Sequence, residues 1–456
     1  MTAPSRQAAH QVLWDVQTGS ADLPHALARA RHSLDDPRDR ALTTEIVTGT
    51  LRWQAALDHR IAQLTSRPLQ RLDEDILVLL RAGTYQLLHL TRVPSHAVVN
   101  DAVALTKTIG KRSASSLVNA VLRSVASRGR SLRLPMRPET NPNTSLKTDR
   151  QQALDYLNIT LSHPRWLVER WLDREGFETT ERWASFNNKP APIALAVNQL
   201  IATRTSLAAE LETHGVLTRP GRWSTDTLIV TEGNPLLTPL ASQGSFLIQD
   251  EASQLVSTIV TATPGSRVLD ACASPGMKTV AIAGTLKDRG LIAAADHRPP
   301  RVSLLSETLA RCRVSCAHVV RLDSRRQMPF GTLFDWVLLD VPCSGLGTIR
   351  RDPDIRWRRK AAELLERKVE QSAMLAAAAD AVRPGGWLVY ATCSSEPEEN
   401  EEVVNNFLTT RADFVASPIE VSALTPFINH LGYFQTRPAI HELDAFFAAK
   451  MQRRIL

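Results

Sequence analysis

The sequence predicts a multidomain protein in which an all-α bundle (residues 1–130) and a small α+β module (151–245) precede a larger α/β domain (246–456). The length of 456 residues exceeds what a single hydrophobic core usually supports. Apolar residues recur at helical spacing in the first part. In the last part, strand-like apolar runs alternate with helix-like runs, a pattern typical of a mostly parallel, Rossmann-like sheet with helices on both faces.

The all-α bundle is predicted by apolar residues such as Ile46, Leu57 and Ile61, which share one face of amphipathic helices. Residues 131–150 follow as a basic linker that is rich in proline and turn residues. The linker is either a solvated tether or a contact for nucleic-acid phosphates. The module after it is predicted from short helical and strand-like runs that alternate with Asn, Pro and Gly turns.

Composition and charge exclude several classes of protein. A hydrophobic share of 43% and a charged share of 22% indicate a globular protein, and no apolar run approaches the roughly 20 residues that a membrane span requires. Five scattered cysteines are too few for a disulfide framework, so we expect reduced thiols. Polar residues interrupt the N-terminal segment before the apolar core of a signal peptide could form, so we expect a cytoplasmic location. The net charge of +7 suits a phosphate-rich partner, although basicity alone also supports solubility.

The predicted cofactor site is a strand–loop–helix junction over residues 270–279, DACASPGMKT. A helix N-terminus presents free N–H groups and a positive dipole end, which suit an anionic group. The Gly-x-Gly-x-x-Gly pattern of dinucleotide-binding proteins is absent, so a carboxyl-bearing nucleoside such as S-adenosyl-L-methionine fits better than NAD. Asp296 ends the second strand, where it can bind ribose hydroxyls, and Asp323 ends the third, where it can meet an adenine amino group.

Two cysteines lie at the ends of predicted strands, Cys343 in DVPCSG and Cys393 in YATCSS. Carbon-5 of cytosine is a poor nucleophile, so its methylation requires thiolate attack on carbon-6, a second group that helps to release the product, and an acid that hydrogen-bonds the ring. The two thiols and Asp340, three residues before Cys343, match these requirements. The other cysteines are expected to be buried small apolar residues rather than metal ligands: Cys272, Cys312 and Cys316.

The segment Ser395–Glu398 has the composition of a helix start, with a cap residue, a proline in the first turn and a capping-box acid. We therefore predict that a helix begins just after Cys393 and that its N-terminus lowers the pKa of the Cys393 thiol. The alternative is that the acids of EPEENEE serve only to complement the helix dipole.

The order and spacing of four motifs resemble the RsmB (Sun/Fmu) family of bacterial 16S ribosomal RNA cytosine-C5 methyltransferases. These motifs are FLIQDEASQLV, DACASPGMKT, LLDVPCSGLGTIRRDPDIRW and LVYATCSSEPEEN. The helical N-terminus, with RALTTEIVTGTLR and LVNAVLRSV, is similar to a NusB-like RNA-binding domain. The resemblance covers nearly the whole chain. It implies an enzyme with an RNA-binding α+β module that methylates a specific cytosine of 16S rRNA or of a small-subunit assembly intermediate with S-adenosyl-L-methionine. We assume a monomer, and the cysteine pattern predicts no metal site.

The resemblance also implies a role for individual residues. Cys393 would attack carbon-6, Cys343 would assist release of the methylated product, and Lys278 would face the cytosine beside Asp340. The S-adenosylmethionine site would be lined by Cys272, Ala273, Ser274, Pro275, Gly276, Met277, Lys278, Asp296, Asp323 and Asp340.

Two positions depart from the usual family pattern. The loop usually reads Pro-Gly-Gly-Lys, and Met277 replaces the second glycine. If this position requires a positive φ or close approach to the cofactor, methionine weakens cofactor binding. Ala445 also stands where the family usually has glycine. The competing interpretations are a 5-methylcytosine methyltransferase that acts on tRNA and a NusB-like RNA-binding adaptor whose catalysis is weakened through Met277.

A basic run follows the Pro-Cys motif. Residues 350–360, RRDPDIRWRRK, hold six Arg or Lys residues against two Asp. One interpretation is that this run grips RNA phosphates near a flipped base, with Trp357 stacking on a base. The other is that it forms a solvated surface.

Overall fold

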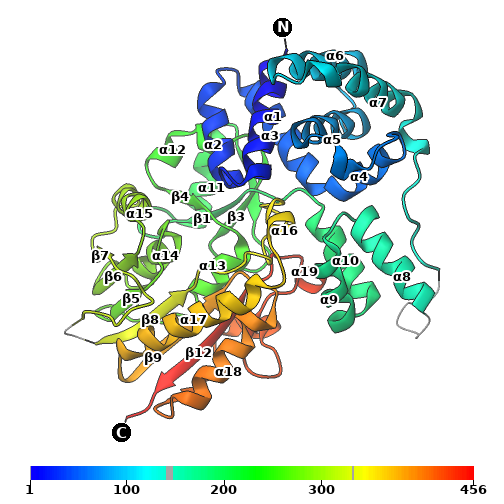
Figure 1. Cartoon of the computed structure of the whole chain (residues 1–456). Coiled ribbons are helices and arrows are strands. Elements are labelled where there is room, and N and C mark those ends of the chain that lie inside the picture. Colours follow the sequence, from blue (N-terminus) through cyan, green and yellow to red (C-terminus); the bar gives the residue numbers. More distant parts are fainter. Residues whose placement is uncertain (1, 140–146, 331–332, 456) are drawn as a thin grey trace. The chain divides into compact units, whose positions relative to one another are not determined.

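The computed structural model describes residues 2–139, 147–330 and 333–455 (Figure 1). The chain forms two compact units. The helical unit comprises Met1–Pro190 with Ile349–Arg359, and the sheet unit comprises Ala191–Thr348 with Lys360–Leu456. The division at Pro190 falls inside the segment 151–245, so the part of that segment up to Pro190 belongs to the helical unit, and the strands and helices that follow belong to the sheet unit. Part of the predicted linker, residues 140–146, lies outside the described residues.

The helical unit is built from amphipathic helices whose apolar faces meet in buried clusters. Ile46 and Val47 belong to one cluster, and Ile61, Leu80 and Leu122 belong to a second. The prediction of an all-α bundle is confirmed. The α-helices of this unit are α1 (Pro4–Thr18), α2 (Leu23–Ser33), α3 (Pro37–Arg52), α4 (Gln54–Ala62), α5 (Glu74–His89), α6 (Ser95–Thr108), α7 (Ser115–Arg128), α8 (Lys147–Asp155), α9 (Arg165–Glu175), α10 (Phe177–Asn187) and α16 (Ile355–Arg358).

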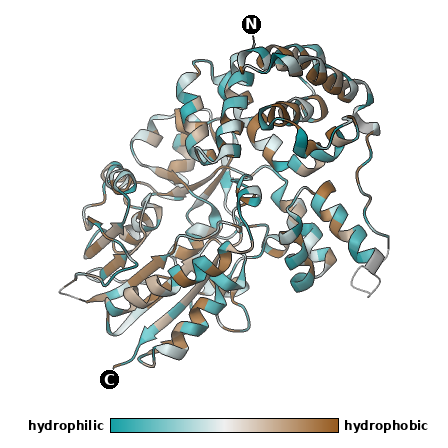
Figure 2. Ribbon diagram, in the orientation of Figure 1, coloured by the Kyte–Doolittle hydropathy of each residue, from teal (hydrophilic) through white to brown (hydrophobic). Residues whose placement is uncertain are grey.

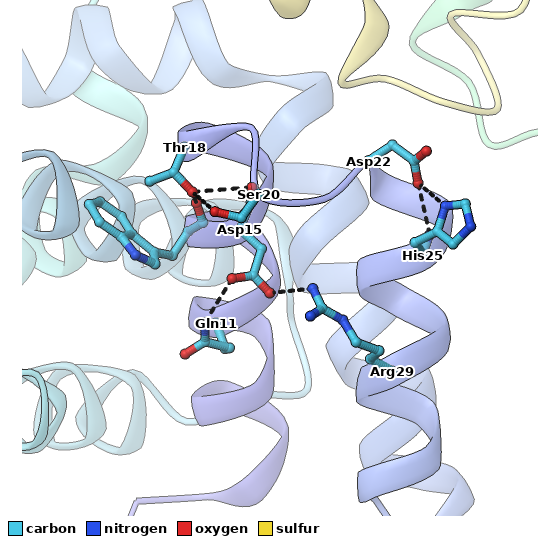
Figure 3. Close-up of polar contacts among 8 residues, drawn as sticks. Gln11, Asp15, Thr18, Ser20, Asp22, His25 and Arg29 are labelled. Atoms are coloured by element: carbon cyan, nitrogen blue, oxygen red, sulfur yellow. Dashed lines mark hydrogen bonds and ion pairs between the residues drawn. The ribbon is translucent and has the colours of Figure 1, made fainter.

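Polar side chains join α1 to α2 (Figure 3). The carboxylate of Asp15 on α1 accepts a hydrogen bond from Gln11 at 2.9 Å and another from Arg29 of α2 at 2.9 Å. Asp22 is the N-cap residue of α2, and its carboxylate accepts the backbone N–H of His25 at 3.0 Å. This bond satisfies one of the donors that every helix N-terminus leaves without a partner inside the helix.

The sheet unit begins with a small antiparallel sheet in the order β2-β3-β1-β4. Leu195 on β1 and Leu228 on β3 pack against Leu207 and Leu211, which lie four residues apart on one face of α11. The prediction of a small α+β module is confirmed. Its elements are β1 (Ala194–Val197), α11 (Arg204–Thr213), β2 (Leu217–Pro220), β3 (Thr227–Glu232), α12 (Pro239–Ser242) and β4 (Phe246–Ile248).

The larger sheet has the order β10-β12-β9-β8-β5-β6-β7, with β11 paired to β12. Neighbouring strands from β9 to β7 are parallel, whereas β12 and β10 are antiparallel to their neighbours. The predicted mostly parallel sheet is therefore confirmed. The strands are β5 (Arg267–Asp270), β6 (Leu291–Asp296), β7 (Ala317–Arg321), β8 (Phe334–Asp340), β9 (Val382–Thr392), β10 (Phe414–Ala416), β11 (Phe434–Gln435) and β12 (Phe447–Arg453).

Helices cover both faces of this sheet because successive strand residues point to opposite sides. Leu269 of β5 packs with α17 and α18, whereas its neighbour Val268 packs with α13 and α14. Figure 2 shows the apolar residues concentrated on the strands between these helices. The helices are α13 (Glu251–Ser257), α14 (Met277–Thr285), α15 (Pro299–Arg311), α17 (Glu363–Asp380), α18 (Glu401–Thr410) and α19 (Pro438–His441).

Candidate active site

The carboxyl ends of the parallel strands bring the predicted site residues to one edge of the larger sheet. Strand β5 ends at Asp270, β8 ends at Asp340, and β9 ends one residue before Cys393. Asp340 is in register with Ala391, so the motif that contains Asp340 lies directly beside the one that contains Cys393. This edge is where doubly wound sheets bind their ligands.

The two predicted working thiols are in direct contact. The Sγ atoms of Cys343 and Cys393 lie 2.8 Å apart, and both cysteines are free thiols that are partly exposed. The hydrogen bond with the Cys393 sulfur, together with burial, holds the pKa of Cys343 well above its ordinary value. Cys343 therefore keeps its proton.

The remaining cysteines have no such partner thiol. Cys312 and Cys316 are buried in the core, as predicted, and burial raises the pKa of Cys316 to about 12. Cys272 is partly buried beside the apolar cluster that α17 covers, and burial raises its pKa as well. The surroundings of these three cysteines do not favour a reactive thiolate.

Lys278 and Asp340 form an ion pair next to the thiols. The Nζ atom of Lys278 donates to Asp340 Oδ2 at 2.6 Å and to the Ser253 hydroxyl at 3.1 Å. Burial opposes the charge on Lys278, but the attraction to Asp340 outweighs it and raises the pKa of the amine. Lys278 is thus a charged donor fixed in position by two acceptors. Ser253, which sequence reasoning missed, lies in the FLIQDEASQLV motif.

The loop between β5 and α14 has the expected strand–loop–helix form. Asp270 is buried, and its Oδ2 atom accepts the Thr279 hydroxyl at 2.7 Å, whereas Oδ1 has no hydrogen-bond partner among the described residues. Burial raises the pKa of Asp270 to about 6. Gly276, with a φ of +107°, precedes α14, and no side chain caps the helix. The first N–H groups of α14 are therefore left for another acceptor. Of the predicted loop residues, Ala273 and Ser274 are buried, and Pro275 is partly buried.

Met277 does not occupy a strained position. It is the first residue of α14, and the positive φ of this loop belongs to Gly276 instead. Its side chain packs beside a cluster that includes Val280 and Leu305. Residue 277 does not need a positive φ, because the turn that requires this conformation is completed one residue earlier. Ala445 is likewise accommodated, with its N–H donating to the Gly347 carbonyl at 2.9 Å.

The two outer acids are paired with arginines. Asp296 is buried at the end of β6 and forms an ion pair with Arg301 at 3.3 Å; Arg301 also donates to the Ser274 carbonyl at 2.6 Å. Asp323 lies two residues beyond β7, and its two oxygens accept hydrogen bonds from Arg325 at 2.8 and 2.9 Å. These bonds lower the pKa of Asp323 to about 2. Asp323 is therefore an ionised acceptor.

No α-helix begins directly after Cys393, which contradicts the prediction. Pro397–Glu399 form a single 3-10 turn, and α18 begins only at Glu401. The Ser395 hydroxyl donates to the Glu396 carboxylate instead of capping a helix. The segment is shaped by tertiary contacts: the carboxylate of Glu399 and the amide of Asn400 bind the cysteine loops. No α-helix N-terminus therefore lies directly after Cys393, where the prediction placed one to act on the thiol.

The basic run is not a simple solvated surface, and Arg356 is not available to RNA. Residues Ile349–Arg359 belong to the helical unit, where Arg356 is fully buried. Its guanidinium donates to the backbone carbonyl of Ser162 at 2.9 Å and to the Asn188 side chain at 2.9 Å. The Trp357 indole N–H donates to the Leu51 carbonyl at 2.6 Å. These two side chains therefore hold the segment in place.

Three parts of the chain match known protein families. Residues 257–452 match the family described as 16S rRNA methyltransferase RsmB/F, residues 3–127 match the NusB family, and residues 163–236 match the ferredoxin-like domain of RsmF/B-like methyltransferases. The fold and the matched segments define an RNA methyltransferase of the type that joins a Rossmann-like domain to a NusB-type bundle.

Relatives that match along most of the chain identify the family within this class of methyltransferases. The chain is 32% identical to the probable ribosomal RNA small subunit methyltransferase B of Bacillus subtilis over 91% of each chain, and 34% identical to ribosomal RNA small subunit methyltransferase B of Pseudomonas putida over 88% of each. The solved structure of a methyltransferase homolog protein from Pyrococcus horikoshii is 27% identical, with a TM-score of 0.58, over 66% of this chain and 98% of that one. The chain belongs to the RsmB/F family of 16S rRNA methyltransferases.

The described residues were compared with the requirements of a metal site and of a membrane-spanning helix. No group of three or more His, Cys, Asp or Glu side chains suited to a metal ion occurs among the described residues. Across the same parts of the chain, no helix has the length and apolar character needed to cross a membrane.

Proposed function

We propose that this enzyme transfers a methyl group from S-adenosyl-L-methionine to carbon-5 of a specific cytosine in 16S rRNA, through a covalent bond between Cys393 and the base. The observation that carries the proposal is the contact between the thiols of Cys343 and Cys393 at 2.8 Å, on the same sheet edge as the Lys278–Asp340 ion pair. A pair of thiols beside a partly buried donor and acceptor matches the needs of this reaction, which must activate carbon-6 and later restore the free enzyme.

The loop before α14 fits the proposed methyl donor. Its uncapped helix N-terminus offers backbone N–H groups to a carboxylate, and the unpartnered Asp270 Oδ1 leaves an acceptor beside them for an amino group. Asp296 and Asp323 provide carboxylate oxygens that can accept hydrogen bonds from ribose hydroxyls and an adenine amino group. When bound, S-adenosylmethionine supplies an electrophilic methyl group. The residues proposed to hold it are Cys272–Lys278, Asp296, Asp323 and Asp340.

The steps other than methyl donation are assigned to side chains of this protein. Cys393 is proposed as the nucleophile that attacks carbon-6, and the neighbouring Cys343, which keeps its proton, can donate a hydrogen bond to the Cys393 sulfur. Lys278 and Asp340 present a donor and an acceptor 2.6 Å apart, which can hydrogen-bond the ring nitrogen and exocyclic amine of cytosine. Cys343 then assists release of the methylated base. Reduced thiols require a reducing compartment, which fits a cytoplasmic enzyme.

The substrate is tested in cells. The proposal expects that deletion of the gene abolishes one 5-methylcytosine in 16S rRNA, read by bisulfite sequencing, and that the wild-type gene restores it while Cys393→Ala does not. Loss of a methylcytosine from tRNA instead would support the alternative substrate. Calorimetry with S-adenosylmethionine separates the enzyme from an RNA-binding adaptor, since the adaptor would bind none. Comparing free 16S rRNA with small-subunit assembly intermediates in vitro identifies the form that the enzyme, proposed to be a monomer, methylates.

A further inference from the structure

Each of the two cysteines is followed by a buried serine, and both serines bind the same carboxylate. Glu399 is fully buried. Its carboxylate accepts the Ser344 backbone N–H at 2.8 Å, the Ser344 hydroxyl at 2.5 Å and the Ser394 hydroxyl at 2.5 Å. Gln371 of α17 adds a further donor at 3.0 Å. One side chain thus joins the Pro-Cys-Ser loop to the Thr-Cys-Ser loop.

A second connection lies between the same loops. The Gly347 N–H donates to the Cys393 carbonyl at 2.9 Å, and the Gly347 carbonyl accepts the Ala445 N–H at 2.9 Å. A Cβ atom at Gly347 would lie 2.7 Å from the Cys393 carbonyl oxygen and 2.0 Å from that of Ala445. The backbones therefore approach so closely that only glycine fits. Together with Glu399, this contact sets the distance between the two thiol-bearing segments.

The four donors to Glu399 are uncharged groups, so the carboxylate is stabilised by hydrogen bonds from neutral partners in the interior. Hydrogen bonds to a charged acceptor are stronger than neutral ones, and removing the acceptor leaves buried donors without a partner. Three of the donors belong to the two cysteine loops, and two of these three are on Ser344. The position of the loop that carries Cys343 therefore depends on Glu399 more than the position of the loop that carries Cys393 does.

We propose that Glu399 is a positioning residue that holds Cys343 in register with Cys393, and that it acts mainly on product release. This inference rests on the proposed covalent mechanism. In release, a water molecule accepts the proton on carbon-5, whose electron pair restores the double bond between carbon-5 and carbon-6. The bond from carbon-6 to sulfur breaks with its pair returning to Cys393, the Cys343 thiol donates its proton to that sulfur, and the proton held by water then returns to Cys343. Attack requires Cys393 alone, whereas release requires Cys343 at the correct distance.

The test compares Glu399→Gln with Glu402→Gln in the full-length protein. Glu402 is a nearby acid on α18 that pairs with Lys368 at the surface, so its replacement changes the same charge without touching the cysteine loops. Each variant is incubated with S-adenosylmethionine and 16S rRNA, and the covalent protein–RNA adduct is quantified on a denaturing gel beside the rate of methylation and the affinity for S-adenosylmethionine. Circular dichroism checks the fold.

We expect Glu399→Gln to lower turnover by about tenfold or more and to increase the adduct fraction, with S-adenosylmethionine affinity within about twofold of wild type. Glu402→Gln should match wild type. Ser344→Ala removes one donor and keeps the acid, so it should show a smaller change in turnover and adduct in the same direction. This variant replaces Glu399→Gln as the test if Glu399→Gln does not fold. Turnover that falls without adduct, or remains unchanged, would overturn the role of Glu399. If wild-type protein makes no 5-methylcytosine, or Cys393→Ala still forms adduct, the proposed function fails instead.

Discussion

The sulfur atoms of Cys343 and Cys393 lie 2.8 Å apart although fifty positions separate the two residues in the chain. The contact arises because β8 and β9 are adjacent parallel strands, so the loops that follow them leave the sheet at the same edge. The two thiols are nevertheless proposed to act at different steps, Cys393 in the attack on carbon-6 and Cys343 in the release of the methylated base. This difference underlies the first prediction.

Cys343→Ala should accumulate a covalent protein–RNA adduct, because the nucleophile remains while release is impaired, and Cys393→Ala should form none. Both variants should lose multiple-turnover methylation, measured by transfer of labelled methyl groups to 16S rRNA. Cys312→Ala is the matched control, since it removes an equivalent sulfur from the buried core. Adduct in Cys393→Ala and its absence in Cys343→Ala would exchange the two roles.

Lys278→Met should lower the methylation rate by about 100-fold or more, because loss of a preorganised charged donor costs about 3 kcal/mol in transition-state stabilisation. Asp340→Asn should have a similar effect. The double variant should be little worse than either single variant, since each removes the same pair. Lys368→Met removes a partly exposed cation of α17 that pairs with Glu402, and it should leave the rate unchanged. Additive losses in the double variant would show that the two residues act separately.

Asp270→Asn should change stability in a pH-dependent manner. Burial raises the pKa of Asp270 from 3.8 to about 6, so the folded protein holds this proton more tightly than the unfolded chain. The resulting stabilisation is complete below pH 3.8 and is lost as the pH rises through about 6. Relative to wild type, the variant should therefore gain about 3 kcal/mol between pH 3.5 and pH 7. Denaturant unfolding of both proteins across this range measures the difference, and a pH-independent difference would contradict the prediction.

Met277→Gly should not improve affinity for S-adenosylmethionine by more than about twofold, because Met277 already has helical geometry and the turn is made by Gly276. The substitution should lower stability by up to about 1 kcal/mol, since glycine is a poor helix former. Calorimetry and thermal unfolding measure the two quantities. A large gain in affinity would mean that the methionine side chain obstructs the cofactor.

Arg356→Ala should destabilise the helical unit by about 3 kcal/mol, because several buried carbonyl groups lose their donor at once. Arg123→Ala, an exposed position on α7, should change stability by less than about 0.5 kcal/mol. Hydrogen exchange should report faster exchange in residues 349–359 for Arg356→Ala alone. Equal effects of the two substitutions would show that Arg356 does not anchor this segment.

Much of the fold could be predicted because its signals are local. The strand–loop–helix junction at residues 270–279, the acids at strand ends and the helical periodicity before residue 130 depend on neighbouring residues only. Where local signals conflicted with distant partners, the prediction was wrong. Ser395–Glu398 has the composition of a helix start, yet the first α-helical residue is Glu401.

The sequence by itself determined the class of fold, the strand-end motifs and the two cysteines that merit study. Only the tertiary structure decided that the thiols touch, that Glu399 binds the loops of both, and that Arg356 is buried rather than exposed to RNA. The physical reason is that these contacts join residues separated by many positions. They depend on which strands are neighbours and on which buried donors lack a partner, and neither property is encoded in any one stretch of the chain.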